Sequence, residues 1–102
     1  MRSHKTVQMT VSFNNTLEHG RAYQSIGRIR TAAPWQGDLS SVAEADRLSL
    51  VRALIHEAES YAADAIVELQ FDVENIRSAD IDGALLRRVT ATGVAVRYAE
   101  AA

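Results

Sequence analysis

Residues 65–74 read Ala65-Ile66-Val67-Glu68-Leu69-Gln70-Phe71-Asp72-Val73-Glu74, in which apolar and polar side chains alternate strictly from Val67 onward. Successive side chains of a strand point to opposite faces, so this alternation predicts a strand with one buried face. A second β-rich run extends from Arg87 to Tyr98, after the polar loop from Ser78 to Gly83. Gly83 suits the positive φ of such a loop. The two runs therefore predict a β-hairpin.

Charge and side-chain volume predict the register of this hairpin. Pairing Glu74 with Arg88 brings opposite charges together, and a slip by one residue would turn the carboxylates into the core. The same register gives the further polar-face pairs Asp72–Thr90, Gln70–Thr92 and Glu68–Val94. On the other face it gives the pairs Val73–Val89, Phe71–Ala91, Leu69–Gly93 and Val67–Ala95, which leave room for a helix. Val94, Val96 and Tyr98 fall on the polar face, where we expect a lone chain to expose them.

The N-terminal part of the chain predicts two more strands. From Lys5 to Phe13, apolar residues alternate with hydroxyl and amide residues. Asn14-Asn15 then indicates a turn, since Asn tolerates left-handed backbone angles. The run from Arg21 to Thr31 is rich in β-branched residues, and Gly27 within it favours a strand with a bulge.

A long helix is expected between the two pairs of strands. After the turn from Pro34 to Asp38, Ser41-Val42-Ala43-Glu44 fits a capping box, so we expect a helix from about residue 41 to 63. Its apolar stripe comprises Leu48, Val51, Ile55, Ala58 and Ala62, widened by Leu50, Leu54 and Tyr61. That stripe is wider than one small sheet needs, so part of it should meet another subunit. The predicted fold is α+β: a β-β-α-β-β subunit of one domain (residues 1–102), whose antiparallel sheet carries one long helix.

Composition excludes several classes of protein. The chain has 102 residues, a net charge of −2, 47% hydrophobic and 24% charged residues, and no cysteine. Scattered Lys and Arg argue against nucleic acid or a membrane surface as a partner. Without cysteine there can be no disulfide, thiolate ligand or cysteine nucleophile. No apolar run reaches the length of a membrane span and no signal core is present, so the cytoplasm is the expected location.

The segment from Leu48 to Val96 resembles the YbjQ family, also called UPF0145 or DUF74. The resemblance rests on Ala62-Ala63-Asp64-Ala65 leading into the alternating strand, and on Val89-Thr90-Ala91-Thr92-Gly93-Val94-Ala95-Val96. Ala62 stands where the family usually has Gly. The resemblance implies a small α+β subunit that assembles as a closed ring, a homopentamer. It brings a provisional heavy-metal-binding label but no set of catalytic residues.

Metal ligands are scarce in the sequence. The histidines are His4, His19 and His56, and with no thiolate a metal would need converging His and carboxylate groups. His56 and Glu59 lie three residues apart and share a helical face, so they are the candidate metal ligands. Such a pair needs further ligands from other helices or from a symmetry-related chain. A solvated or salt-bridged helix His is the simpler interpretation.

The hairpin offers a second group of candidates. Glu68, Asp72 and Glu74 form an acidic row that could hold a hard cation or supply acid–base chemistry. Pairing with Arg88 and hydroxyl contacts to Thr90 and Thr92 explain the row more simply. Trp35, the only Trp, is a candidate binding anchor or a lid over the core edge.

No nucleophile elbow, P-loop or dinucleotide fingerprint is present. The sequence thus favours a non-enzymatic oligomeric module that binds a small ligand or metal ion at subunit interfaces, with candidate ligand or interface residues Trp35, Glu68, Asp72, Glu74, Val94, Val96 and Tyr98. The alternatives are a small enzyme that uses interface carboxylates and His56, and a purely structural or protein-interaction ring. No cofactor is specified by any motif.

Overall fold

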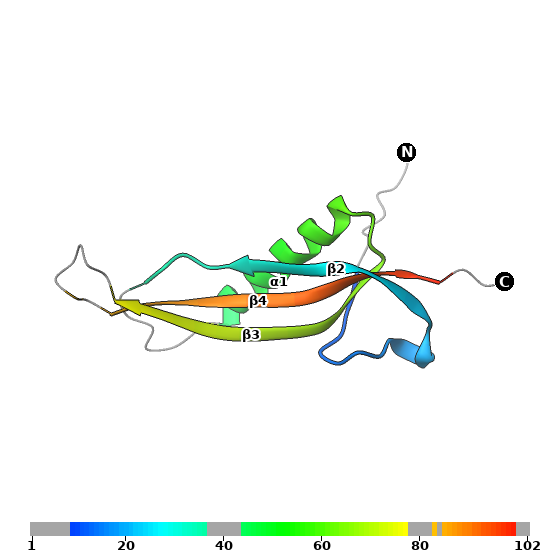
Figure 1. The fold of residues 1–102 in the computed structure, drawn as a ribbon, viewed down its shortest axis with the longest axis horizontal. Helices are drawn as coiled ribbons and strands as arrows, with labels where there is room; N and C mark the ends of the chain where they lie inside the picture. The colour runs from blue at the N-terminus through cyan, green and yellow to red at the C-terminus, as the bar shows by residue number, and fades with distance from the viewer. Residues whose placement is uncertain (1–8, 37–43, 78–82, 84, 100–102) are drawn as a thin grey trace.

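A mixed four-stranded sheet with one helix on it forms the protein (Figure 1). The computed structural model describes residues 9–36, 44–77, 83 and 85–99. In chain order the elements are β1 (Thr10–Val11), the 3-10 turn η1 (Glu18–Gly20), β2 (Tyr23–Ala32), α1 (Glu44–Ser60), β3 (Ala65–Arg77) and β4 (Leu85–Tyr98). The predicted α+β class and β-β-α-β-β order are confirmed. Residues 5–8 of the expected first strand and the capping box up to Ala43 lie outside the described residues.

The sheet is mixed rather than antiparallel, which corrects one detail of the prediction. Its strand order is β1-β3-β4-β2, and β1 runs parallel to β3, with Thr10 opposite Ala65 and Val11 opposite Ile66. β2 pairs with β4 at the far edge. The chain therefore crosses from one edge of the sheet to the other between β1 and β2, and these two strands cannot form a hairpin.

The helix packs through a narrower stripe than predicted. Leu50, Leu54 and Ala58, spaced four residues apart, are buried against the sheet. Leu48 and Tyr61, at the two ends of the expected stripe, are 49% and 50% exposed. α1 crosses the sheet obliquely, as Figure 1 shows, and it contacts β2 and β4 more than β3. Each end of the helix therefore reaches a different edge of the sheet.

The helix ends in a Schellman motif, earlier than expected. Ala62 has a φ of 58°. Its N–H donates to the Glu59 carbonyl at 3.0 Å, and the Ala63 N–H donates to the Ala58 carbonyl at 3.1 Å. These two bonds satisfy carbonyls that the last helical turn leaves unpaired. The left-handed residue is usually Gly, so Ala62 is a departure from the pattern.

The hairpin register is confirmed along its outer part and shifts at a bulge. Gln70 faces Thr92 and Glu74 faces Arg88, as predicted. The register then changes between Val67 and Gln70, so that Glu68 and Leu69 together oppose the single residue Gly93. Glu68 adopts a φ of 57°, the left-handed conformation found at the first residue of one common bulge type. The predicted pairs Val67–Ala95 and Glu68–Val94 are wrong because Val67 faces Val94.

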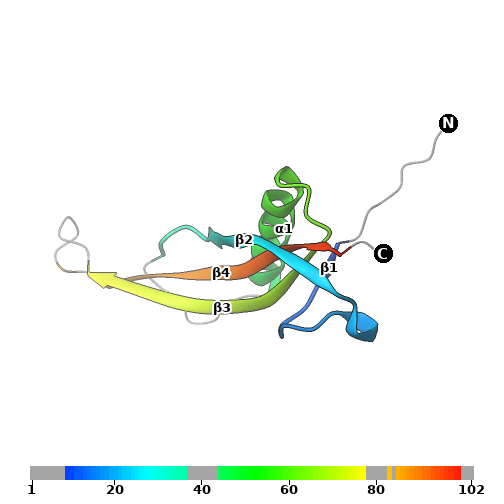
Figure 2. The same ribbon diagram turned by 45° about the vertical axis from the view of Figure 1, so that its right-hand side comes forward.

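A second bulge lies on the other side of β4. The register of β2 and β4 shifts between Ser25 and Gly27, which leaves Ile26 as the extra residue beside the predicted position. Bulges increase the local twist of a sheet. Both neighbours of β4 are thus bulged near the same level, and the sheet twists strongly there (Figure 2).

The twisted end of the sheet carries a second, smaller core on the face away from α1. Its buried members are Leu17, Ala65, Val67 and Val96, with Tyr23, Val94 and Tyr98 packed around them. The segment that leads through η1 covers this face, and Val96 has no exposed surface. The expectation that a lone chain exposes Val96 is therefore wrong, because residues distant in sequence cover it, while Val94 and Tyr98 are partly buried against the same core.

Candidate functional site

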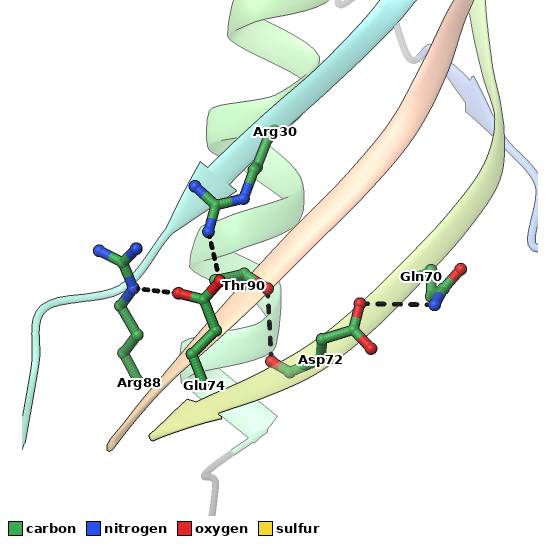
Figure 3. A network of polar contacts seen from close by, with 6 residues as sticks. All are labelled: Arg30, Gln70, Asp72, Glu74, Arg88 and Thr90. Atoms are coloured by element: carbon green, nitrogen blue, oxygen red, sulfur yellow. Dashed lines mark hydrogen bonds and ion pairs between the residues drawn. The ribbon is translucent and has the colours of Figure 1, made fainter. Parts of the chain in front are cut away.

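An ion-pair network occupies the outer, polar part of the sheet face away from α1 (Figure 3). Glu74 accepts hydrogen bonds from Nε of Arg88 at 2.7 Å and from a guanidinium nitrogen of Arg30 at 2.8 Å. The hydrogen bond from Arg88 does most to lower the pKa of Glu74 below its ordinary value of 4.5; it outweighs the effect of burial, which raises the pKa, while Arg30 lowers it further. Glu74 is thus held as a carboxylate between two cations. The predicted cross-strand pairing with Arg88 is confirmed.

Of the acidic row expected along β3, Asp72 and Glu74 keep the regular spacing of alternate strand positions, whereas Glu68 is separated from them by the bulge. Asp72 accepts a hydrogen bond from the Gln70 amide at 3.4 Å, and its backbone carbonyl accepts one from the Thr90 hydroxyl at 3.5 Å. Glu68 lies at the bulge, where its backbone N–H donates to the Asn14 carbonyl at 2.9 Å. The bulge breaks the alternation that the row requires, so the three carboxylates do not form one ligand set with regular spacing.

Trp35 extends the Glu74 network at the edge of the sheet. The Arg88 guanidinium lies 4.3 Å from the centre of the Trp35 ring, in cation–π contact. Backbone hydrogen bonds of 2.7 and 2.8 Å between Gln36 and Arg87 fix the neighbouring segment. Trp35 is half-buried. Arg88 thus bridges the carboxylate and the indole.

The candidate metal ligands His56 and Glu59 are exposed residues of α1. Across the described ranges there is no group of three or more His, Cys, Asp or Glu residues that could hold a metal ion. Within one chain, a metal at His56 and Glu59 would therefore lack enough described protein ligands. Their role as ligands stays a prediction that depends on a second chain.

A pocket that the sequence analysis missed lies beside η1. It has a volume of about 330 Å³ and is lined by Thr10, Leu17, Glu18, His19, Arg21 and Tyr98. Of these residues, only Tyr98 was a candidate from the sequence. The available signal was the tripeptide Glu18-His19-Gly20, because a Gly beside charged residues often marks a tight turn. It could not show that the C-terminal strand lies next to that turn.

Backbone and side-chain contacts fix the walls of this pocket, the η1 pocket hereafter. The Arg21 guanidinium lies over the Tyr98 ring, 3.7 Å from its centre. The Tyr98 N–H donates to the Asp64 carboxylate at 2.8 Å. His19 has a φ of 60°, which is uncommon for a residue other than Gly. An Arg, a His and a Tyr are therefore held around one hollow.

Two further hollows lie at opposite edges of the sheet, each at one end of the oblique helix. The first edge surface, about 170 Å³, is lined by Phe13, Arg47, Leu48, Val51, Leu69 and Phe71. The second edge surface, about 230 Å³, is lined by Ile26, Gly27, Arg28, Ile29, Tyr61 and Ala95. Phe13 is 71% exposed and Tyr61 is 50% exposed, so both surfaces present large apolar groups to solvent.

The fold defines a small α+β domain with a helix on one face of a twisted mixed sheet. A family described as "Putative heavy-metal-binding" matches residues 35–99. The chain belongs to this YbjQ family, as the resemblance indicated. A crystal structure of a DUF74-family protein of unknown function from Pediococcus pentosaceus ATCC 25745 is similar, with a TM-score of 0.53 and 13% identity over 89% of this chain and 98% of that one. At that identity the likeness concerns the fold alone.

No curated protein matches the sequence. Among the described residues, no helix is long and apolar enough to span a membrane.

Proposed function

We propose that this protein is a non-enzymatic, cytoplasmic module that assembles with copies of itself and binds a small ligand. The resemblance to its family favours a closed ring of five chains. The observation that carries the proposal is the pair of apolar edge surfaces at opposite edges of the sheet.

Two different surfaces on opposite sides suit a ring. A contact between unlike patches repeats from copy to copy and closes when the rotation permits, whereas a contact between like patches stops at a dimer. The oblique α1 builds both surfaces: Leu48 near its start lies with β3, and Tyr61 just beyond its end lies with β2. A second copy of this chain is therefore the proposed occupant of each surface.

Charged residues of both signs lie at or beside these two surfaces. Arg47 lines the first edge surface and lies 5.5 Å from the centre of the Phe71 ring. Next to the second surface, the Tyr61 hydroxyl donates to the Glu57 carboxylate at 3.4 Å. Because Arg28 lines the second surface itself, charge alone does not select it as the partner of the surface that contains Arg47, and the exposed apolar groups carry the proposal.

The polar groups support a binding role more than catalysis. Glu74 is engaged by two arginines and its pKa is lowered, which makes it a poor proton acceptor. His56 lies on α1, whereas Glu74 lies on the opposite face of the sheet. Within one chain the proposed enzymatic pair of His56 and an interface carboxylate would therefore have to act across the sheet.

Light scattering and native mass spectrometry test the assembly. We expect a multi-subunit mass for the natural chain and smaller species for Leu48→Glu and for Tyr61→Glu. Ile76→Glu is the matched control, since Ile76 is also an exposed apolar residue (45%) but lies outside both surfaces. A monomer mass for the natural chain at micromolar concentration would contradict the proposal.

Mixing the two variants tests whether unlike surfaces meet. Leu48→Glu keeps the second edge surface intact and Tyr61→Glu keeps the first, so together they retain one intact interface. The mixture should form a heterodimer while each variant alone stays monomeric. A contact between like surfaces would give no such complementation.

A further inference from the structure

We propose that the η1 pocket binds a small anion through a carboxylate or phosphate group, with Arg21 as its anchoring cation. The inference deepens the ligand-binding part of the proposed function and rests on it, but it does not depend on the number of subunits. The pocket lies outside both edge surfaces, since the three hollows have no lining residue in common.

Arg21 is positioned for anion recognition. Its guanidinium carbon lies over the Tyr98 ring, 3.7 Å from the ring centre, in cation–π contact. Within the described ranges, the ion pairs join Glu74 to Arg30 and Arg88, and none involves Arg21. A planar fork of N–H donors held in this way fits carboxylate or phosphate oxygens in a bidentate arrangement.

Further donors line the same hollow. His19 and Thr10, whose side chains can both donate hydrogen bonds, lie in its wall. His19 holds a left-handed φ of 60° and is followed by Gly20 with a φ of 63°. A left-handed conformation is unfavourable for an L-residue, and such outliers cluster at binding sites. The turn thus tolerates a conformational cost while presenting an imidazole at the pocket.

Size and rigidity agree with a small ligand. A volume of about 330 Å³ lies at the lower end of ligand-binding cavities. Leu17 is buried and belongs to the second core, which gives the hollow an apolar wall. The Ala99 N–H donates to the Ala22 carbonyl at 3.1 Å, and the Tyr23 hydroxyl donates to the Asn15 carbonyl at 2.6 Å. The frame around the pocket is therefore formed before any ligand binds.

Glu18 also lines this pocket, and its negative charge would repel an anion. The opposite charges of Glu18 and Arg21 therefore distinguish a pocket for anions from a pocket for cations. If an anion binds, removing the Glu18 charge must strengthen binding and removing the Arg21 charge must weaken it. A pocket for cations would respond in the opposite way to both changes.

The experiment is a titration of the full ¹⁵N-labelled chain with sodium phosphate and, separately, sodium acetate, against sodium chloride at matched ionic strength. We expect saturable shifts of the Gly20, Arg21 and Tyr98 amides with one or both anions, and none with chloride. The anion that saturates identifies phosphate or carboxylate as the preferred group. Chloride-like behaviour of both anions would overturn the inference.

Variants assign the binding to the pocket. Arg21→Gln should weaken it about tenfold, the loss expected for a charge-assisted hydrogen bond. Glu18→Gln should strengthen it, and Arg52→Gln, an exposed helix arginine outside the pocket, should leave it unchanged. Equal weakening by Arg21→Gln and Arg52→Gln, or tighter binding by Arg21→Gln, would overturn the inference.

His19→Asn removes the imidazole and keeps a residue that tolerates left-handed angles. It should weaken anion binding without lowering the melting temperature. Unchanged binding in His19→Asn would overturn the part of the inference that assigns a role to His19. The subunit mass, measured on the same samples, separates any failure of assembly from a failure of this site.

Discussion

Gly93 and Ile66 approach each other so closely that a Cβ atom at position 93 would clash with the Ile66 side chain. A Cβ atom on Gly93 would lie 2.6 Å from Cγ2 of Ile66 and 3.4 Å from the Val67 carbonyl oxygen. The bulge on β3 causes this approach, since Glu68 and Leu69 together oppose Gly93. The bulge on β3 thus favours a residue without a side chain at the facing position of β4.

Gly93→Ala should therefore destabilise the fold by about 1–3 kcal/mol, because an overpacked core must shift to admit the methyl group. Urea unfolding followed by circular dichroism measures the change. Gly27→Ala is the control: a Cβ atom on Gly27 would have no described neighbour within 4 Å, and this glycine sits in the other bulged strand. Equal midpoints for Gly93→Ala and the natural chain would contradict the packing described around Ile66.

Ala62→Gly should stabilise the protein. Ala62 holds a φ of 58° at the left-handed position of the Schellman motif, which costs about 1–2 kcal/mol for an L-residue. The greater flexibility of unfolded glycine offsets part of that gain, so a net stabilisation of about 0.5–1 kcal/mol is expected. Ala53→Gly, in the exposed helix interior, should act in the opposite direction by about 1 kcal/mol. A lower melting temperature for Ala62→Gly would contradict the assigned helix end.

Much of the fold was predictable because side-chain alternation and charge pairing are local signals. Glu74 opposite Arg88 and Phe71 opposite Ala91 follow directly from them. The bulge on β3 could not be predicted from these signals. The alternation continues unbroken through Val67-Glu68-Leu69, yet Glu68 adopts a conformation that usually requires Gly. A single left-handed Glu thus moved the inner half of the hairpin by one residue.

The candidate site was less predictable because it depends on contacts between distant segments. Leu17 covers Val96, so the apolar residues that suggested an interface belong to the chain's own second core. The η1 pocket likewise joins Arg21 to Tyr98, residues that are far apart in sequence. Periodicity reports on one element at a time and carries no information about which loop covers which strand.

Glu74→Gln should reduce the loss of stability on acidification. The lowered pKa of Glu74 means that its stabilising contribution is fully present above the ordinary pKa of 4.5 and is lost as the pH falls through the lower folded-state pKa. The natural chain should therefore lose more melting temperature than Glu74→Gln in that acidic range. Asp72→Asn, which removes a neighbouring carboxylate that has no ion pair among the described residues, is the control. Parallel pH profiles for the natural chain and Glu74→Gln would show that the ion pairs contribute nothing measurable.

Val96→Glu should unfold the chain rather than only separate subunits. Val96 has no exposed surface within one chain, and an unpaired buried charge costs about 3–5 kcal/mol. Circular dichroism should show a large fall in melting temperature, in contrast to Leu48→Glu, whose side chain is 49% exposed. A folded monomer of the Val96→Glu variant would instead indicate that Val96 lies at an interface between copies.

The last prediction concerns metal, because the family description names heavy-metal binding while this chain offers few ligands. With no Cys, a soft-metal site would rest on imidazoles and carboxylates. His56 and Glu59 share one exposed helical face, and a stable site would need their counterparts from another copy. We therefore expect no stoichiometric zinc or copper in protein purified without added metal, as measured by elemental analysis alongside the subunit mass. About one zinc per subunit that is lost in His56→Ala, but retained in His19→Asn, would contradict this prediction and place the metal at the helix. Loss of zinc together with loss of the multi-subunit mass in Leu48→Glu would show that neighbouring copies supply the remaining ligands.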